Sequence, residues 1–214
     1  VHVIVSECYN AGAVTAKDNA GGIVGRVTTA GIYKGNNRII GCSNRGSVTA
    51  GGYVGGILAE IPNNSACNVL IESCFNTGTL TATNQTEDQH IGGIVGMGFD
   101  RILNCYHAGT LEAGSTTGRS YRGGILGYVA KGTGAATLAH NYSVQSASLS
   151  VGGHAEDAVL ADDTTLMLAS SMQEESFIDT LNRYEKPVSL YQVTFAMDSK
   201  AENDGYPVIG KLER

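Results

Sequence analysis

Gly92-Gly93-Ile94-Val95-Gly96 is one of four close copies of a five-residue motif in the first 130 residues. The other copies are Gly21 to Gly25, Gly55 to Ala59 and Gly123 to Gly127. A second motif precedes each copy, as Cys8-Tyr9-Asn10-Ala11-Gly12, Cys42-Ser43-Asn44-Arg45-Gly46, Cys74-Phe75-Asn76-Thr77-Gly78 and Cys105-Tyr106-His107-Ala108-Gly109. These cysteines are 34, 32 and 31 residues apart, and a degraded fifth copy begins at Asn141. A period of this length indicates a stacked repeat array.

Each repeat contains three short runs of β-type residues. The first run ends in the cysteine motif, the second follows the glycine of that motif, and the third is the Ile-Val or Ile-Leu pair between glycines. Three short runs do not make a sheet alone, but each can pair with the same run of the next repeat about 4.8 Å away. The pattern predicts an all-β fold, a right-handed parallel β-helix (solenoid) of about five coils.

Side-chain alternation along the runs predicts which residues line the interior. The cysteine and the residue two positions later share one parity, which predicts a buried structural ladder of Cys8, Cys42, Cys74, Cys105, Asn10, Asn44 and Asn76. The amides are expected to satisfy backbone groups at the turns. An apolar residue also lies three positions before each cysteine, and this odd offset predicts a corner or bulge between the two.

The position after each cysteine points outward and is mostly aromatic. Tyr9, Phe75, Tyr106 and Tyr142 are therefore a candidate ligand platform. Stacked rings on a surface bind sugar rings or another protein, but the same rings could also lie beneath the longer loops. Both interpretations stay open from the sequence.

Residues 154–214 differ from the repeats of residues 1–153. Ser171 and Glu174 have the spacing of a capping box, and a helix with an apolar face is expected to follow. Residues 191–197 alternate as a half-buried strand does. We expect a small α+β C-terminal cap over the open end of the solenoid. The strand-like start at Val1 suggests an uncapped N-terminal end and neighbouring domains in a longer parent chain.

Charge and cysteine spacing limit the partners. A net charge of −6 and a pI near 5.3 disfavour nucleic acid and anionic membranes, and no run of 18 apolar residues predicts membrane insertion. No cysteine pair has zinc-site spacing, so no metal or cofactor is predicted. Cys67 lies out of register and is expected to be the most reactive thiol. Asp198, Glu202 and Asp204 could form a calcium site, but a solvated acidic turn is the favoured interpretation.

Enzymes built on β-helices take two or three carboxylates from neighbouring coils. Here the outward position seven residues after each cysteine contains Thr15, Thr49, Thr81 and Glu112. Equivalent positions of successive repeats therefore supply a single carboxylate. His90 beside Asp88 is interpreted as part of a solvated loop, although the two long loops leave room for these residues to meet Glu112 or Arg119. The sequence therefore predicts no catalytic residues and no enzyme.

The paired motifs resemble GLUG-motif repeats, over roughly residues 1–153. Such repeats occur in large secreted or wall-attached proteins of Gram-positive, often gut-dwelling bacteria, and in non-catalytic regions of some immunoglobulin-cleaving metallopeptidases. The helix at Ser171 to Asn182 and the ending Asn203-Asp204-Gly205-Tyr206-Pro207-Val208 resemble the elements that often follow them. Ala59, His107 and the fifth copy, which lacks the cysteine and the turn glycine, depart from the pattern.

The resemblance implies an extracellular or cell-surface location. The expected function is a non-catalytic structural or adhesive module of a large bacterial protein, with host glycan or protein surfaces as partners. A carbohydrate-binding module is the alternative, followed by a polysaccharide lyase or hydrolase. An exposed aromatic strip would favour the carbohydrate-binding module, and outward carboxylates gathered in space would favour the enzyme.

Overall fold

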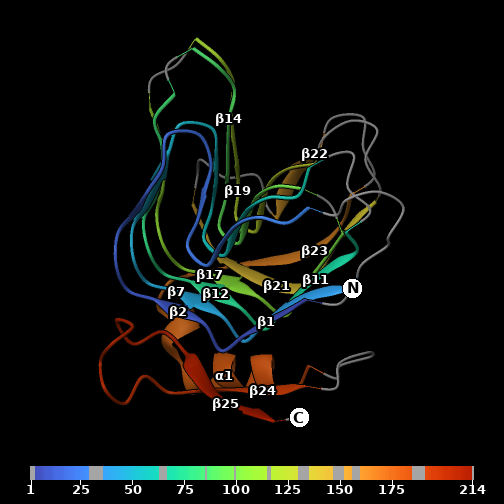
Figure 1. Cartoon of the computed structure of the whole chain (residues 1–214). Coiled ribbons are helices and arrows are strands. Elements are labelled where there is room, and N and C mark those ends of the chain that lie inside the picture. Colours follow the sequence, from blue (N-terminus) through green and yellow to red (C-terminus); the bar gives the residue numbers. More distant parts are fainter. Residues whose placement is uncertain are drawn as a thin grey trace.

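In this computed structural model the chain forms an all-β parallel solenoid of about four turns, with one short α-helix near the C-terminus (Figure 1). The structure describes residues 3–28, 36–62, 67–84, 86–98, 100–114, 117–129, 135–146, 152–155, 160–184 and 191–213. Within these ranges four coils are complete and a fifth is partial, slightly fewer than the repeats predicted. The predicted fold class is confirmed, while the right hand of the coil stays a prediction.

The largest sheet, sheet A, has ten strands and two halves. The first half contains β1 (Ile4–Ser6), β6 (Asn37–Ile40), β11 (Val69–Glu72) and β16 (Asp100–Leu103), and the second half contains β2 (Tyr9–Asn10), β7 (Ser43–Asn44), β12 (Phe75–Asn76) and β17 (Tyr106–His107). β21 (Ala136–Val144) and β23 (Leu160–Met167) run through both halves. All pairs in the sheet are parallel, so each coil repeats the register of the one before.

Three smaller parallel sheets complete each coil. Sheet B contains β3 (Val14–Thr15), β8 (Val48–Ala50), β13 (Leu80–Ala82) and β18 (Leu111–Ala113). Sheet C contains β4 (Ala20–Gly21), β9 (Tyr53–Gly55), β14 (Gln89–Gly92) and β19 (Ser120–Gly123). Sheet D contains β5 (Val24–Arg26), β10 (Leu58–Glu60), β15 (Val95–Met97), β20 (Leu126–Val129) and β22 (Gly153–Ala155).

A residue in the left-handed backbone region separates the two halves of sheet A in every coil. It immediately precedes the cysteine column and is Glu7, Gly41, Ser73, Asn104 or His140, with φ between 51° and 59°. This turn restarts the alternation, so Ile71 and Cys74 both point inward and are 1% and 0% exposed. The predicted corner is therefore confirmed.

The prediction of three strands per coil is corrected to five. The corner divides the cysteine run into two strands. The second additional strand is that of sheet C, which lies in the stretch that the sequence analysis treated as a variable loop. Its residues pair because the glycine pair after them is in register from coil to coil, as in His90 opposite Tyr53 and Gly92 opposite Gly55.

Apolar columns hold the coils together. The core between sheets A and D consists mainly of side chains that are at most 3% exposed, namely Ile39, Cys42, Ile57, Leu58, Ile71, Cys74, Ile94, Val95, Ile102, Cys105, Ile125 and Leu126. A second core lies between sheets B and C and includes Val48, Val54, Leu80 and Ile91. Burying one such aliphatic side chain contributes about 1.5–3 kcal/mol, so these columns supply the main stabilising term.

The two sequence motifs meet inside the solenoid. A Cβ atom added to Gly56, the second glycine of its motif, would lie 2.2 Å from the carbonyl oxygen of Gly93 and 2.5 Å from the Cβ of Asn76. The same relation joins Gly22 to Asn44 and Gly93 to His107. The glycine pair is therefore required because the asparagine column of the next coil packs directly against its backbone.

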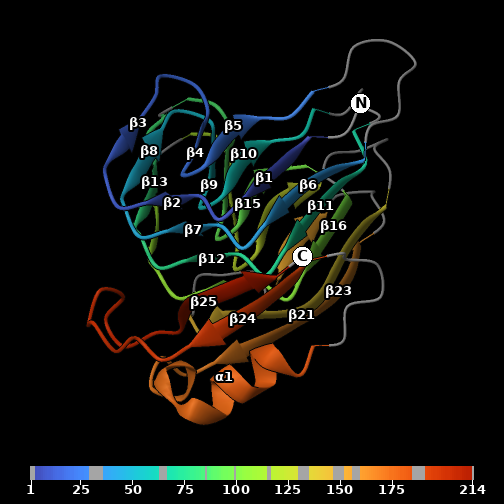
Figure 2. The same cartoon turned by 60° about the horizontal axis from the view of Figure 1, so that its bottom comes forward.

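The C-terminal unit consists of η1 (Ser171–Gln173), α1 (Glu175–Asn182) and an antiparallel pair, β24 (Gln192–Ala196) and β25 (Val208–Glu213). It packs on the outer face of sheet A (Figure 2). There Phe177, Ile178 and Phe195 cover Phe75 and Tyr106. The prediction that this unit covers the open end of the solenoid is therefore corrected. The aromatic column offers it a large apolar surface, whereas the end of sheet A continues through β23.

The division predicted at residues 153 and 154 stays a prediction, although β23 lies beyond it and still pairs with β21. In the described part of the chain, no helix has the length and apolar character needed to cross a membrane.

Candidate functional site: a histidine and tyrosine cleft

The outer faces of sheets C and D meet at the corner made by the glycine motif. Tyr53, His90 and Tyr121 form one outward column of sheet C, because they occupy the same register in three successive coils. Tyr128 belongs to the outward column of sheet D, opposite Met97 of the preceding coil. We call Tyr53, His90, Tyr121 and Tyr128 the His–Tyr cluster.

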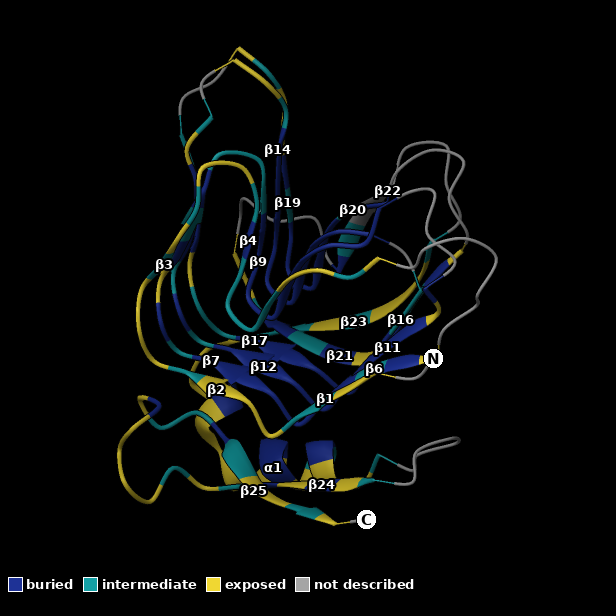
Figure 3. Cartoon of the chain, viewed as in Figure 1, coloured by how far each residue is buried: buried dark blue, intermediate teal, exposed yellow. Residues whose placement is uncertain are grey.

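The four rings form one connected cluster in which His90 contacts each of the three tyrosines. His90 and Tyr121 stack with 5.0 Å between centroids and an interplanar angle of 6°. Tyr128 reaches across the corner to within 4.7 Å of both rings, and Tyr53 lies 5.0 Å from His90 at a tilt of 50°. His90 and Tyr121 are 8% and 7% exposed, whereas Tyr53 and Tyr128 are half-buried. The cluster thus has a buried base and two half-buried rings. Figure 3 shows that β14, the strand that contains His90, is buried.

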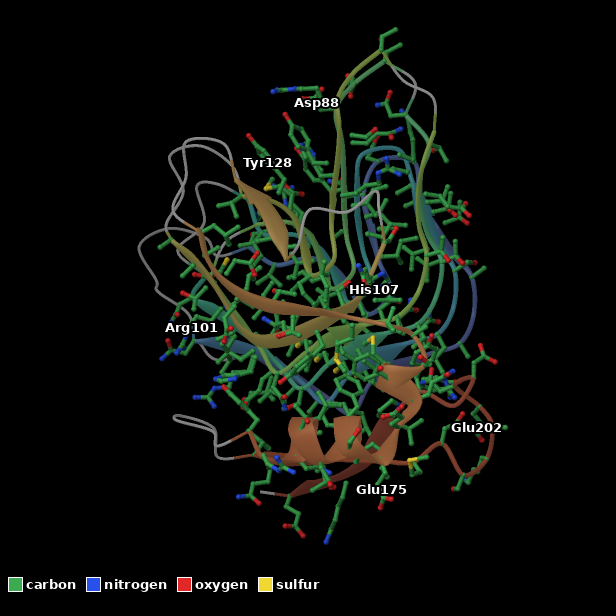
Figure 4. All side chains as sticks on the ribbon, turned by 180° about the vertical axis from the view of Figure 1, so that it is seen from behind. Asp88, Arg101, His107, Tyr128, Glu175 and Glu202 are labelled. Atoms are coloured by element: carbon green, nitrogen blue, oxygen red, sulfur yellow. The ribbon has the colours of Figure 1, made fainter. Side chains whose placement is uncertain are left out.

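An ion pair borders the cluster on one side. Arg119 Nη2 lies 3.1 Å from Asp88 Oδ2, and the backbone N–H of Arg119 donates to Asp88 Oδ1 at 2.7 Å. The Arg119 guanidinium also lies over the Tyr121 ring, 5.1 Å from its centroid. Hydrogen bonding from the backbone and side chain of Arg119, together with its charge and that of His90, lowers the pKa of Asp88. Figure 4 shows Asp88 and Tyr128 on the same side of the tall strands β14 and β19.

A second polar group borders the opposite side. Glu60 is 8% exposed, and its Oε2 lies 3.3 Å from Arg26 Nε and accepts a hydrogen bond from Asn19 Nδ2 at 3.1 Å. Asn19 Oδ1 in turn accepts from the backbone N–H of Tyr53 at 3.0 Å. Burial, followed by the charges of Glu60 and Glu87, raises the pKa of the Tyr53 hydroxyl.

The cluster opens into a cleft of about 350 Å³. Its walls are Lys17, Asp18, Asn19, Gly51, Gly52, Tyr53, Asn84, Glu87, Asp88 and His90. The turn between sheets B and C is only Gly51-Gly52 in the second coil, while the third coil has the longer loop of residues 83–88. Because this short turn has no side chains, residues 17–19 of the first coil and residues 84, 87 and 88 of the third border a gap there, and the cleft lies in this gap.

The sequence analysis did not detect this cleft. The sequence does contain a signal for the cleft. One outward column lies two residues before the first glycine of each Gly-Gly motif, and the other lies five residues after it. The first set is Asn19, Tyr53, His90 and Tyr121, and the second is Arg26, Glu60, Met97 and Tyr128. Offsets counted from the cysteine do not show this relation, because the loops between the cysteine and the glycine pair differ in length.

His90 beside Asp88 is not a solvated loop constellation, and that interpretation is corrected. His90 lies in β14 and is stacked, and Asp88 and Arg119 do meet across the two long loops. Glu112 does not join them, because its Oε2 accepts from Thr81 Oγ1 at 3.3 Å on sheet B.

The predicted cysteine column lies in register, and its members are reduced. Cys42, Cys74 and Cys105 are fully buried, and Sγ of Cys74 and of Cys105 accepts the backbone N–H of the cysteine one coil earlier at 3.4 and 3.3 Å. Cys8 is exposed because no described coil covers it. Cys67 is fully buried with its Sγ 3.5 Å from the carbonyl oxygen of Val27, so the expectation of a reactive Cys67 is wrong.

The predicted asparagines form a continuous chain of amide hydrogen bonds. Asn10 Nδ2 donates to Asn44 Oδ1, and Asn44 Nδ2 donates to Asn76 Oδ1, both at 2.7 Å. Each amide also donates to the carbonyl of the turn glycine two residues later, at 2.9 to 3.1 Å. These side chains satisfy the backbone carbonyl groups of the turns. Asn44 and Asn76 are fully buried, so of the three only Asn10 is accessible to a ligand.

The proposed aromatic platform is corrected, because the C-terminal unit covers most of it. Phe75 and Tyr106 are 2% and 0% exposed, and Tyr142 is half-buried with its ring edge-on to Phe177. Tyr9 is 52% exposed and stacks on the Arg45 guanidinium, 4.2 Å from the ring centroid. Of the four predicted platform residues, Tyr9 is the one whose ring is exposed, so the column does not present a row of rings to a ligand.

Metal ligands were not predicted. In the ranges that the structure describes, no group of three or more His, Cys, Asp or Glu side chains is arranged to hold a metal ion. The Asp198 carboxylate instead accepts the backbone N–H groups of Glu202, Asn203 and Gly205 at 2.8 to 3.1 Å.

No family model and no curated protein matches the chain. Among solved structures, the chain is similar to a crystal structure described as "a putative immunoglobulin A1 protease from Bacteroides ovatus", with 17% sequence identity and a TM-score of 0.61. The match covers 96% of this chain and 57% of that chain. At this identity the likeness establishes the solenoid fold alone, and membership of the GLUG family stays a prediction.

This comparison corrects the expectation that the chain is not an enzyme. That expectation rested on the repeat pattern, in which equivalent outward positions of successive coils supply a single carboxylate, that of Glu112. A protein with the same fold is described as a protease, so the fold does not support the exclusion. Asp88 and His90 of the third coil also converge with Arg119 of the fourth, and the equal-offset criterion does not cover such an arrangement.

Proposed function

We propose that the chain is a structural and adhesive repeat module of a large extracellular or cell-surface protein, with the His–Tyr cleft as its recognition surface. The observation that supports this best is the cleft itself, where the half-buried Tyr53 ring and charged side chains border an opening of about 350 Å³. The walls are held by strand register and by ring contacts. A preformed surface loses little conformational entropy on binding.

The similarity to the Bacteroides ovatus chain supports a place within a longer protein, since this chain corresponds to 57% of it. The description of that protein makes immunoglobulin A1 the first partner to test, both as a ligand and as a substrate. The GLUG resemblance supports an extracellular location. Antibody labelling of intact cells that express the parent protein tests this location.

Adhesion is tested with beads coated with the folded chain and passed over immobilised mucin, immunoglobulin A1 and extracellular matrix proteins. We expect retention on at least one surface. A cleft variant, Tyr53→Ala with Asp18→Asn and Glu87→Gln, should lower retention at least tenfold. The matched control, Tyr9→Ala with Asp204→Asn and Glu175→Gln, changes exposed residues of the same kinds elsewhere and should retain it. Failure of the parent chain to bind any surface would refute the adhesive function.

Incubation of the chain with immunoglobulin A1, followed by electrophoresis, tests proteolysis independently. Cleavage that is lost in Asp88→Ala and kept in Asp198→Ala would place activity at the cleft. Cleavage without retention on any surface would replace the adhesive function by an enzymatic one.

A further inference from the structure

We propose that the cleft binds a neutral, hydroxyl-rich oligosaccharide, with the ring of Tyr53 as its stacking surface. This inference rests on the adhesive function proposed above and adds the chemical class of the ligand. Three features of the cleft support it: the ring of Tyr53, the charges of the lining side chains and the shape of the opening.

Tyr53 is the ring of the cluster that lines the cleft and also remains partly accessible. Its neighbour His90 is tilted by 50° rather than stacked on it, so one face of the Tyr53 ring is not covered in parallel by His90. By contrast, Tyr121 is stacked on His90 and bordered by Arg119. An accessible aromatic face with polar groups beside it binds the C–H face of a sugar ring while its hydroxyls reach the polar groups.

The polar groups needed for hydroxyl recognition lie around this ring. Lys17 and Asp18 line the cleft, and their side chains make no hydrogen bond or ion pair within the part of the chain that the structure describes. A carboxylate accepts two hydroxyl donors and an ammonium donates to hydroxyl oxygens, so the pair matches adjacent hydroxyls on one sugar. Asp88 is already held by Arg119 and shapes the wall.

The charge of the cleft selects between sugar classes. Its lining contains three carboxylates, Asp18, Glu87 and Asp88, and one ammonium, Lys17, while Arg119 neutralises Asp88. Asp18 and Glu87 outweigh Lys17, so the cleft has no excess positive charge to attract the anionic groups of sulfated, sialylated or uronic sugars. Neutral sugars carry no such penalty. A volume of about 350 Å³ is at the small end of ligand sites and suits a short segment of a glycan.

A peptide ligand fits the cleft less well. Peptides commonly bind by adding a strand to a free sheet edge, but β9 and β14, which line the cleft, are paired on both sides within sheet C. The walls present ring and carboxylate groups rather than free backbone donors. A basic peptide attracted by the carboxylates is therefore the competing outcome of the experiment.

The experiment measures binding of the intact chain to a printed array of neutral, sulfated and sialylated glycans and to a lysine-rich peptide. Neutral hits are then titrated as free oligosaccharides by isothermal calorimetry. We expect neutral glycans to bind, Tyr53→Ala and Asp18→Asn each to weaken binding about tenfold, and Tyr53→Phe to retain it because the ring remains. Tyr9→Ala, which removes an exposed tyrosine elsewhere, should leave the affinity unchanged.

Binding only to anionic glycans or to the peptide would overturn the inference, as would neutral binding that is unaffected by Tyr53→Ala. Circular dichroism of each variant establishes that the fold is retained. If coated beads adhere to a deglycosylated protein and no glycan binds, the adhesive function stands and the sugar inference fails. If soluble glycans bind but no surface retains the beads, the adhesive function fails and the sugar inference stands.

Discussion

The side chains of Asn76 and His107 meet inside the solenoid, where Asn76 Nδ2 lies 3.1 Å from Nδ1 of the imidazole. His107 takes the place that asparagine occupies in the three preceding coils, and it is fully buried. Donation from the Asn76 amide requires a neutral ring with its proton on Nε2. That atom has no hydrogen-bond partner within the described residues. The amide chain therefore ends on a titratable group.

Acid should destabilise the protein through His107. Burial lowers the pKa of His107 from 6.5 to about 4, so the unfolded chain takes up a proton before the folded chain does. Stability should fall as the pH drops from about 6.5 to about 4, by about 3 kcal/mol from this residue. Urea unfolding at several pH values, followed by circular dichroism, measures the loss.

The variant His107→Asn continues the amide chain and carries no titratable group. Its stability should change much less over the same pH interval. An equal loss of stability in the variant would assign the acid sensitivity to other groups. His140→Asn, at an exposed histidine, serves as the control and should behave as the parent chain does.

Cys8 should be the first thiol to react with iodoacetamide. It is exposed, whereas Cys42, Cys67, Cys74 and Cys105 are 0% exposed, and burial raises the pKa of Cys74 well above its ordinary value. Mass spectrometry should find one adduct on the folded chain and five after denaturation. The variant Cys8→Ser should give none while folded. Early labelling of Cys67 would contradict the packing of its segment against the core.

Gly56→Ala should destabilise the protein by at least about 1–3 kcal/mol, because the new methyl group would overlap the backbone of Gly93 and the side chain of Asn76. The control is Gly25→Ala in the same motif, where an added Cβ meets nothing within 4 Å. We expect this second change to alter stability by less than about 0.5 kcal/mol. Unfolding midpoints in urea are measured for both variants. Equal midpoints would contradict the prediction, because they would mean that the coils accommodate the added methyl group with no loss of stability.

Asn203→Ala should loosen the C-terminal unit. Asn203 is 2% exposed, its amide donates to Tyr106 Oη at 3.1 Å and to the carbonyls of Tyr206 and Pro207, and its Oδ1 accepts from Thr77 Oγ1 at 2.6 Å. Loss of these bonds leaves buried groups unpaired and should cost about 1–3 kcal/mol. Hydrogen exchange should become faster in β24 and β25.

Lys200→Ala, at an exposed position of the same loop, is the control for this change and should leave exchange unaltered. Unchanged protection in Asn203→Ala would mean that the apolar contacts of Phe177 and Phe195 hold the unit alone.

The sequence by itself determined the parallel stacking of coils. Glycine pairs, asparagines and cysteines recur at almost constant spacing, and a residue in one coil meets its equivalent in the next, so a local pattern is also a contact pattern. The corner before each cysteine followed from parity, because an odd offset between two inward residues needs one irregular backbone step.

Only the tertiary structure decided which outward columns are accessible. Phe75 and Tyr106 became buried because a unit more than 60 residues later in the chain packs on them, and no spacing within the repeats records that contact. Cys8 and Cys67 exchanged their expected exposures for a similar reason, since one lies at the end of the stack and the other folds inward. The cleft arises at the short Gly51-Gly52 turn, where connections of the first and third coils lie on either side, and stacking of the coils in three dimensions brings them together.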